Sequence, residues 1–147
     1  MNNLNFCIVG CGNHAQKRII PALKNINAKK INAVSSQSIK LPIHKQFSKL
    51  NEALIAVEKE TVFIICSPPH LHFSQAKKII NSGYHLFIEK PITTKLNHLK
   101  KIISLSNSNN AFFVENLMYK YSNFYDTFIN FWKKNKVNIK KIKISFI

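Results

Sequence analysis

The sequence predicts an α/β fold, a doubly wound sheet of parallel strands with helices on both of its faces. Short apolar, β-branched runs alternate along the chain with segments in which apolar residues recur every three or four positions. Only three glycines occur in 147 residues, and Gly10 and Gly12 stand directly after the first apolar run. The alternation therefore predicts repeated strand–helix units, and the two glycines indicate where the first strand turns into the first helix.

Five buried strands are expected, because each apolar run is four or five residues long and rich in Ile, Val and Phe. Residues 38–46 contain Pro42 and are expected to form a loop. The last stretch, KIKISFI, alternates apolar with polar residues, as a half-buried antiparallel strand does, and predicts the opening strand of a second, α+β domain. The five buried strands are expected at 5–9, 31–35, 62–66, 86–89 and 112–115.

Helices are expected between these strands. The first begins at Ala15, and Pro21 inside it is expected to kink or shorten it. Gly83 stands where a left-handed C-terminal cap favours glycine. The other helices are expected at 51–57 with Ser48 or Asn51 as the N-cap, at 71–82 with Ala76, Ile79 and Ile80 facing inward, after Thr93 or Thr94, and at 124–134.

The chain is strongly basic, with 22 Lys and Arg against six Asp and Glu and a formal net charge of +16. Such a charge is typical of proteins that bind nucleic acid or an anionic membrane. Only Arg18 is an arginine, however, whereas proteins that read nucleic acid favour its bidentate guanidinium, and the lysines are scattered. Because Lys, Asn, Ile and Phe are over-used together, as in an AT-rich genome, we expect no nucleic-acid partner.

No window approaches about 18 consecutive apolar residues, and the N-terminus lacks the charged start and apolar run of a secretory signal. We therefore expect a soluble, cytoplasmic protein with no membrane partner. Cys7, Cys11 and Cys66 form no CxxC pair, which argues against a disulfide framework or a thiolate zinc site. His70 and His72 have no evident third ligand, so no metal site is expected.

Residues 9–15 read VGCGNHA, which has the GxGxxA spacing of a dinucleotide-binding turn. The first glycine of such a turn adopts a conformation that a Cβ hinders, and the second lets the backbone approach a pyrophosphate. Ala15 is the small residue at which the new helix packs against the strand. The backbone amides from Gly12 to Ala15 are then expected to point at the phosphates. A tight strand-to-helix turn without a ligand is the alternative.

A dinucleotide fold usually places an acidic residue at the end of its second strand, where it binds the adenosine ribose hydroxyls. The only aspartate of this chain is Asp126, and the second strand ends in VSSQS. Ser36 therefore takes the place of the acid, followed by Gln37 and Ser38, with Lys40 close by. Because an acid would repel a ribose 2′-phosphate, the sequence favours NADP over NAD as the cofactor, with NAD as the alternative.

Two further motifs follow the third and fourth buried strands, which end in FIICSPPHLHF and HLFIEKP. The carboxyl ends of parallel strands lie at one edge of the sheet, so both motifs are expected beside the glycine turn. Together, VGCGNHA, SPPHLH and GYHLFIEKP closely resemble the N-terminal domain of the Gfo/Idh/MocA oxidoreductases, whose typical pattern is GxGxxx, TPNxxH and GKHVxxEKP. The resemblance covers residues 5–125.

The resemblance implies a Rossmann domain that binds NAD or NADP and precedes a C-terminal domain with an open antiparallel sheet. It implies hydride transfer between the nicotinamide and a small, sugar-type alcohol or ketone, and it is compatible with a homo-oligomer. We expect residues 1–120 to form the NAD(P)-binding domain, and 121–147 a linker helix and the first strand of the substrate domain. Because the acid–base residue of the family lies in that second domain, we expect a fragment of a longer enzyme or a gene reduced to its cofactor module.

Matched motif by motif, the resemblance also implies the roles of single residues. Lys90 of EKP would reach the substrate hydroxyl and the nicotinamide ribose, where a cation stabilises negative charge on oxygen, and it is the expected catalytic residue. Pro69 replaces the asparagine of the family, and a cis bond before Pro91 is implied. The expected cofactor-binding residues are Gly10, Gly12, Asn13, His14, Ala15, Ser36, Gln37, Ser67, Pro68, His72 and Glu89.

Two other functions are compatible with the sequence. A non-catalytic dinucleotide sensor or regulatory module would keep the glycine turn and have no need of Lys90. A basic nucleic-acid binder would lose affinity steeply with added salt and show no preference for NADP.

Overall fold

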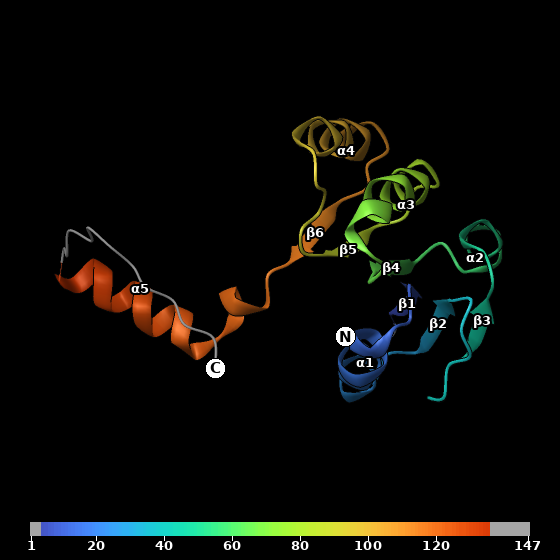
Figure 1. The fold of residues 1–147 in the computed structure, drawn as a ribbon, viewed down its shortest axis with the longest axis horizontal. Helices are drawn as coiled ribbons and strands as arrows, with labels where there is room; N and C mark the ends of the chain where they lie inside the picture. The colour runs from blue at the N-terminus through green and yellow to red at the C-terminus, as the bar shows by residue number, and fades with distance from the viewer. Residues whose placement is uncertain (1–3, 136–147) are drawn as a thin grey trace. The chain divides into compact units, whose positions relative to one another are not determined.

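The computed structural model describes residues 4–135, so the strand expected near the C-terminus lies outside the described residues. The chain divides into two compact units, Met1–Asn116 and Leu117–Ile147. The first unit contains a six-stranded sheet with helices on both faces (Figure 1). This architecture confirms the predicted fold class.

The strands of the sheet are ordered β3-β2-β1-β4-β5-β6, and every neighbouring pair is parallel. The chain first builds outward from β1 through β2 to β3, and then returns to the other side of β1 to add β4, β5 and β6. The direction of winding therefore reverses between β1 and β4, the position at which open α/β sheets bind ligands. The bounds are β1 Asn5–Val9, β2 Lys30–Val34, β3 Lys45–Phe47, β4 Thr61–Ile65, β5 Leu86–Glu89 and β6 Phe113–Asn116.

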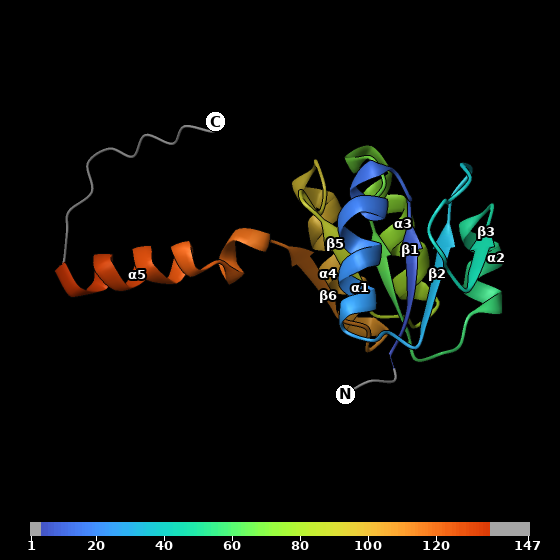
Figure 2. The ribbon, with the colours of Figure 1, turned by 90° about the horizontal axis from the view of Figure 1, so that it is seen from below.

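Helices cover the two faces of the sheet, as the view in Figure 2 shows. One apolar cluster joins α2 (Leu50–Ala56), α3 (Pro69–Asn81) and α4 (Leu96–Ser108) to Cys7 and Val9 of β1. The other joins the segment after β1 to Phe6 and Ile8. Because successive side chains of a strand point to opposite faces, β1 contributes to both clusters and is buried along its whole length.

All five predicted strands are confirmed to within one residue. The structure adds β3, whose first two residues belong to the stretch 38–46 that was predicted to be a loop, so that prediction is wrong for these two residues. This strand has only three residues, lies at the edge of the sheet and buries Phe47 alone. A run this short shows no periodicity that would distinguish a strand from a loop. Its backbone is paired with β2 in the register Asn32↔Lys45.

The first helix is divided, because a π-helical turn, η1 (Ala15–Ile19), precedes α1 (Ile20–Asn25). Pro21 stands in the first turn of α1. Its nitrogen carries no hydrogen, so the bond that would join the two segments as one regular α-helix cannot form. The sequence predicted a kink or a shortening at Pro21, and the structure shows instead a change from π-helical to α-helical bonding just before it.

The N-cap expected for the second helix is wrong. Helix α2 begins at Leu50 after Lys49, and neither Ser48 nor Asn51 caps it through its side chain. Instead the Glu52 carboxylate accepts hydrogen bonds from the backbone N–H groups of Ser48 and Lys49, at 3.2 and 3.3 Å. An acidic third residue therefore satisfies the exposed amides of the helix start from inside the helix.

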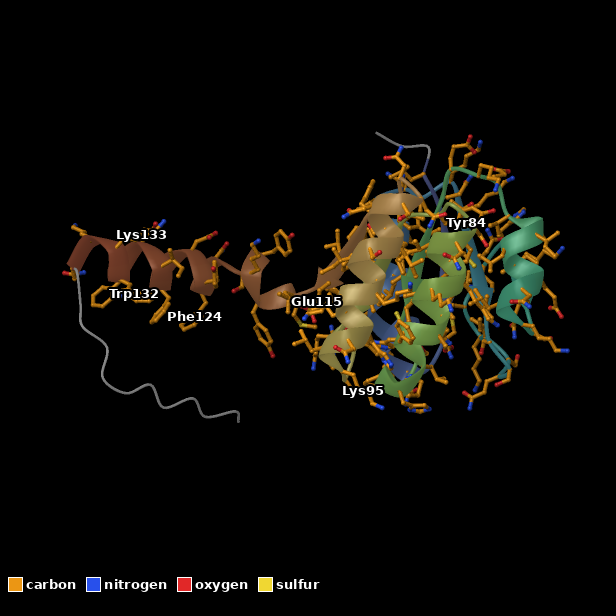
Figure 3. All side chains as sticks on the ribbon, turned by 90° about the horizontal axis from the view of Figure 1, so that it is seen from above. Tyr84, Lys95, Glu115, Phe124, Trp132 and Lys133 are labelled. Atoms are coloured by element: carbon orange, nitrogen blue, oxygen red, sulfur yellow. The ribbon has the colours of Figure 1, made fainter. Side chains whose placement is uncertain are left out.

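Helix α3 begins two residues earlier than expected and buries Ala76, Ile79 and Ile80 as predicted. Gly83 follows it with φ +78°, the left-handed conformation expected there. The next residue, Tyr84, is buried, and its hydroxyl donates to the carbonyl oxygens of Leu54 and Val57 at 3.1 and 3.3 Å. Tyr84, labelled in Figure 3, thereby holds the end of α2 against the sheet.

The second unit contains a 3-10 turn, η2 (Met118–Tyr121), and α5 (Asn123–Asn135), which agrees with the predicted helix to within one residue. Phe124 and Trp132 project from one side of α5, and Lys133 from the opposite side (Figure 3). The Phe128 ring lies between them, with ring centroids 6.4 Å from Phe124 and 6.3 Å from Trp132. Among the described residues no helix combines the length and apolar character needed to cross a membrane.

Candidate functional site

A cleft of about 720 Å³ opens at the carboxyl edge of the sheet, where the chain leaves β1, β2 and β4. It therefore lies at the point where the winding of the sheet reverses. Its walls include eight of the twelve site residues expected from the sequence. The lining residues that the sequence singled out are Gly10, Gly12, Asn13, His14, Ser36, Gln37, Ser67 and Pro68.

Gly10 is required by the close approach of two backbone segments. Its φ is +89°, and a Cβ built on it would lie 2.7 Å from both the Cα and the backbone nitrogen of Ser67. Its N–H donates to the Val34 carbonyl at 3.0 Å. Gly10 therefore draws the end of β1 against the loops that follow β2 and β4, and any side chain would separate them.

Gly12 has a different role, because a Cβ at this position would meet no atom within 4 Å. Its backbone lines the cleft, so the absence of a side chain leaves room for a group to approach the main chain. The turn around it is closed internally, since Gln16 donates through its backbone N–H to the Gly12 carbonyl at 3.1 Å and through its side chain to the Cys11 carbonyl at 3.0 Å. This exposed stretch of backbone fits the pyrophosphate of a dinucleotide.

The loop after β2 carries Ser36 and Gln37 into the cleft lining. Ser35 and Gln37 bond each other, and the Gln46 side chain donates to both of their carbonyl oxygens at 3.1 and 2.9 Å. Gln46, which the sequence did not single out, thus ties this loop to β3. No motif signals it, because it acts across a strand pair that the sequence did not predict.

A second cavity of about 460 Å³ shares Asn13 and Gln37 with the cleft. Lys17 from η1 and Lys40 from the loop after β2 line it. The adjoining cavity is therefore lined by two cations and has no acidic residue in its wall.

His72 lies away from the cleft lining. It is 1% exposed, and its two ring nitrogens lie 2.7 Å from the Ser67 carbonyl oxygen and 2.9 Å from that of Pro91. The ring therefore bridges the loops that follow β4 and β5. Within the cleft itself, Gln75 lies one turn farther along α3 and accepts a hydrogen bond from the Ser67 hydroxyl.

Glu89, the last residue of β5, connects the EKP motif to the glycine turn. Its Oε1 accepts a hydrogen bond from the Asn116 side chain and lies 3.3 Å from Nε2 of His14. Lys90 follows it at an exposed position, and the Lys90–Pro91 peptide bond is cis. The loop is also held by Glu115, whose carboxylate accepts the Ile92 N–H at 3.1 Å. The contact of Glu89 with His14 brings the predicted catalytic edge next to the predicted phosphate site.

The three cysteines are free thiols, of which Cys7 and Cys11 are buried and Cys66 is half-buried. Burial raises the pKa of Cys7 to about 12 and that of Cys11 to about 11. Burial also raises the pKa of Cys66 to about 12, and the negative charge of Glu89 contributes to that rise. Among the described residues, no group of three or more His, Cys, Asp or Glu side chains is placed to hold a metal ion.

A match to a family model assigns the chain to a protein family. Residues 4–117 match the family model described as an oxidoreductase family with an NAD-binding Rossmann fold, Gfo/Idh/MocA. The chain belongs to the Gfo/Idh/MocA family. The sheet and its glycine turn are therefore the NAD-binding Rossmann domain of these oxidoreductases, which confirms the resemblance stated from the motifs.

Relatives of known sequence match part of the chain. Galactose 1-dehydrogenase of Pseudomonas fluorescens is 28% identical over 91 residues, which are 62% of this chain and 30% of that protein. An uncharacterised oxidoreductase of Schizosaccharomyces pombe is 33% identical over 69 residues, 47% of this chain and 18% of that protein. The chain thus spans less than half the length of the relatives that it matches.

Solved structures share the fold. Myo-inositol 2-dehydrogenase from Lactobacillus plantarum superposes with a TM-score of 0.82 at 18% identity, over 92% of this chain and 42% of that one. Scyllo-inositol dehydrogenase from Lactobacillus casei, solved with NAD(H) and scyllo-inositol, gives a TM-score of 0.78 at 20% identity, over 92% and 42%.

The steric environments of the glycines predict unequal effects of alanine. Gly10→Ala combines a left-handed φ with backbone overlap at Ser67, so we expect it to lower the free energy of unfolding by about 3 kcal/mol. Gly83→Ala has a similar φ but open space, so a loss of about 1 kcal/mol is expected. Urea denaturation of both variants measures the difference, and equal losses would refute the steric role of Gly10.

The raised pKa of Cys7 predicts a loss of stability in alkali. The unfolded chain releases this thiol proton near pH 9 and the folded chain only near pH 12. Between these values the folded state binds more protons, so rising pH lowers the free energy of unfolding, by up to about 1.4 kcal/mol per pH unit for this thiol. Urea titrations from pH 8 to 10.5 should show a shallower decline in Cys7→Ala than in the wild type. Identical slopes would contradict the assignment.

Proposed function

We propose that this chain is the cofactor-binding part of an oxidoreductase that transfers a hydride between a nicotinamide cofactor and a sugar-type alcohol or its ketone. One observation carries the proposal: the bare backbone at Gly12 faces a cleft, and the EKP loop meets the same turn through Glu89 and His14. The proposed phosphate site and the cationic residue that follows β5 would therefore lie at one edge of the sheet.

Different residues of the cleft would contact different parts of the cofactor. The turn at Gly10–Ala15 would hold the pyrophosphate through backbone amides, helped by the side chains of Asn13 and His14. Ser36 and Gln37 would contact the adenosine ribose, since they line the cleft on the β2 side. Ser67 and Pro68 would lie along the nicotinamide half. The nicotinamide, when bound, accepts or supplies the hydride.

Lys90 would act on the substrate oxygen. A cation beside the reacting C–O bond stabilises the negative charge that develops on oxygen, and an ammonium can also help to relay the hydroxyl proton. Its loop is held just after Lys90, by His72 through the Pro91 carbonyl and by Glu115 through the Ile92 N–H. These contacts limit the positions available to the residue. His72 supports the site in this way, from outside the cleft lining.

The substrate class is proposed from the relatives. One sequence relative is a galactose dehydrogenase, and two structural neighbours are inositol dehydrogenases. Cyclic polyols of this size present secondary hydroxyl groups that a nicotinamide can oxidise. A small polyol or sugar is accordingly the proposed substrate, and the rest of its site is expected from a longer protein.

NADP is the preferred cofactor in this proposal. Ser36 replaces the acidic residue that is usual at this position and that would repel a 2′-phosphate. Lys17 and Lys40 line the cavity that adjoins Gln37. The net charge of +16 adds an attractive field for an anion of higher charge. A 2′-phosphate on the adenosine ribose would therefore meet cations on the β2 side of the cleft.

Calorimetric titration of the chain with NADPH and NADH tests both the proposed cofactor binding and the proposed preference for NADP. We expect both to bind, NADPH more tightly, and Lys40→Ala to weaken NADPH about 5- to 10-fold while leaving NADH within twofold. Lys100→Ala, an exposed lysine of α4, is the matched control and should change neither. Failure of both cofactors to bind would overturn the proposed function. Tighter binding of NADH would overturn the NADP preference alone.

Replacement of Lys90 tests the catalytic assignment. In a longer protein that contains this chain and turns over a polyol, Lys90→Ala should lower kcat about 100-fold, because the developing oxyanion loses its cation. Cofactor affinity, measured by titration, should change much less. An unchanged kcat would remove Lys90 from the mechanism and would favour a non-catalytic role for this domain.

A further inference from the structure

A small polar cavity lies at the amino edge of the sheet, at the other end of the strands from the cofactor cleft. Asn5, Lys30 and Thr61 are the first residues of β1, β2 and β4, and the register of the sheet pairs Asn5 with both of the others. Paired side chains of neighbouring parallel strands project from the same face, so these three lie in one row. With Asn32 and the end of α2 they line a cavity of about 60 Å³.

Two buried polar atoms of this row are unsatisfied by the protein. Asn5 is 3% exposed and Thr61 is 2% exposed. Within residues 4–135, Oδ1 of Asn5 and Oγ1 of Thr61 have no hydrogen-bond partner. Asn32, which is 5% exposed, adds another buried amide to the wall. Because an unsatisfied buried polar atom is costly, such atoms in native proteins usually bond an ordered water or another bound molecule.

The Glu58 carboxylate determines which end of the Asn5 amide is left for the cavity. One carboxylate oxygen accepts a hydrogen bond from Nδ2 of Asn5, and the other accepts one from the Lys30 ammonium. The bond from Lys30 also lowers the pKa of Glu58, so the carboxyl group stays ionised and can only accept. The amide must therefore direct its nitrogen to Glu58, which leaves the acceptor Oδ1 for an occupant of the cavity.

These groups restrict the chemistry of an occupant. It must donate to Oδ1 of Asn5, and it can accept from the Thr61 hydroxyl. Chloride and sulfate have no hydrogen to donate, although Lys45 lines the cavity. A metal cation would meet Lys30 and Lys45, and the charge of Glu58 is already paired with Lys30. A neutral molecule that both donates and accepts fits, and water is the smallest one.

The dimensions of the cavity also suit water. A single water needs about 10 to 15 Å³ measured in this way, so the cavity has room for more than one. Neighbouring strands lie about 4.8 Å apart, so one water can reach the paired side chains of Asn5 and Thr61. The exposed side chains of His44 and Lys45 line the cavity as well, so solvent can enter from their side.

We propose that this cavity is a hydration site, in which a water donates to Oδ1 of Asn5 and accepts from the Thr61 hydroxyl. The water joins the first residues of β1 and β4, where the side chains make no direct hydrogen bond, and so stabilises the edge of the sheet away from the cofactor. The inference is independent of the proposed function, because the cavity and the cofactor cleft have no lining residue in common.

Thr61→Val distinguishes a hydrated site from a dry one by the sign of the change in stability. Valine has nearly the shape of threonine but cannot bond a water. In a hydrated site, this loss should lower the folding equilibrium constant about 3- to 10-fold in urea denaturation. In a dry site, valine removes an unsatisfied hydroxyl and raises the constant, so an unchanged or raised constant would overturn the proposal. Thr94→Val, at an exposed threonine before α4, is the matched control and should stay within twofold.

Diffraction from crystals of the wild-type protein identifies the occupant directly. We expect electron density for a water at about 2.7 to 3.2 Å from both Oδ1 of Asn5 and Oγ1 of Thr61. Crystals soaked in rubidium bromide test for ions, because both elements scatter anomalously. An anomalous peak in the cavity, or the absence of a water in contact with both atoms, would overturn the hydration site. This measurement needs no variant, so it decides the proposal even if Thr61→Val fails to fold.

Discussion

The close approach of the Gly10 backbone to that of Ser67 is the constraint on which the site depends. A Cβ at Gly10 would lie 2.7 Å from the main chain of Ser67, so the turn after β1 and the loop after β4 meet only because the side chain is absent. The Gly10 N–H also bonds the Val34 carbonyl at the end of β2. Three strand ends are thus held together at the reversal of the sheet, and the cleft opens above them.

The other side of the site depends on polar side chains that join loops. His72 bridges Ser67 and Pro91, Glu115 accepts the Ile92 N–H, and Glu89 receives Asn116. His72 is buried and the Glu89, Glu115 and Asn116 side chains are half-buried, where an unsatisfied polar atom is costly, so each pairing favours one arrangement of its loop. The motifs therefore encode two kinds of residue, those that line the cleft and those that hold its walls.

The local sequence pattern was sufficient to predict most of the strands and helices. Strands of four or five apolar residues and helices with a regular apolar face were predictable, because the pattern follows from which face each element buries. The three-residue β3 was not, since it buries Phe47 alone and depends on pairing with β2. The start of α2 was also missed, because Lys49 is a weak N-cap by type and the Glu52 carboxylate supplies the contact instead.

The sequence by itself determined the strand–turn–helix at Gly10, the order of elements and the candidate site residues, because these follow from conformational preferences within a few positions. Only the tertiary structure decided that His72 is enclosed between two loops and that Gln46 and Asn116 act as supports. It alone brought His14 to Glu89, 75 positions later in the chain. Contacts over such separations are set by strand order and register, and these result from the burial of whole faces of the sheet rather than from any short motif.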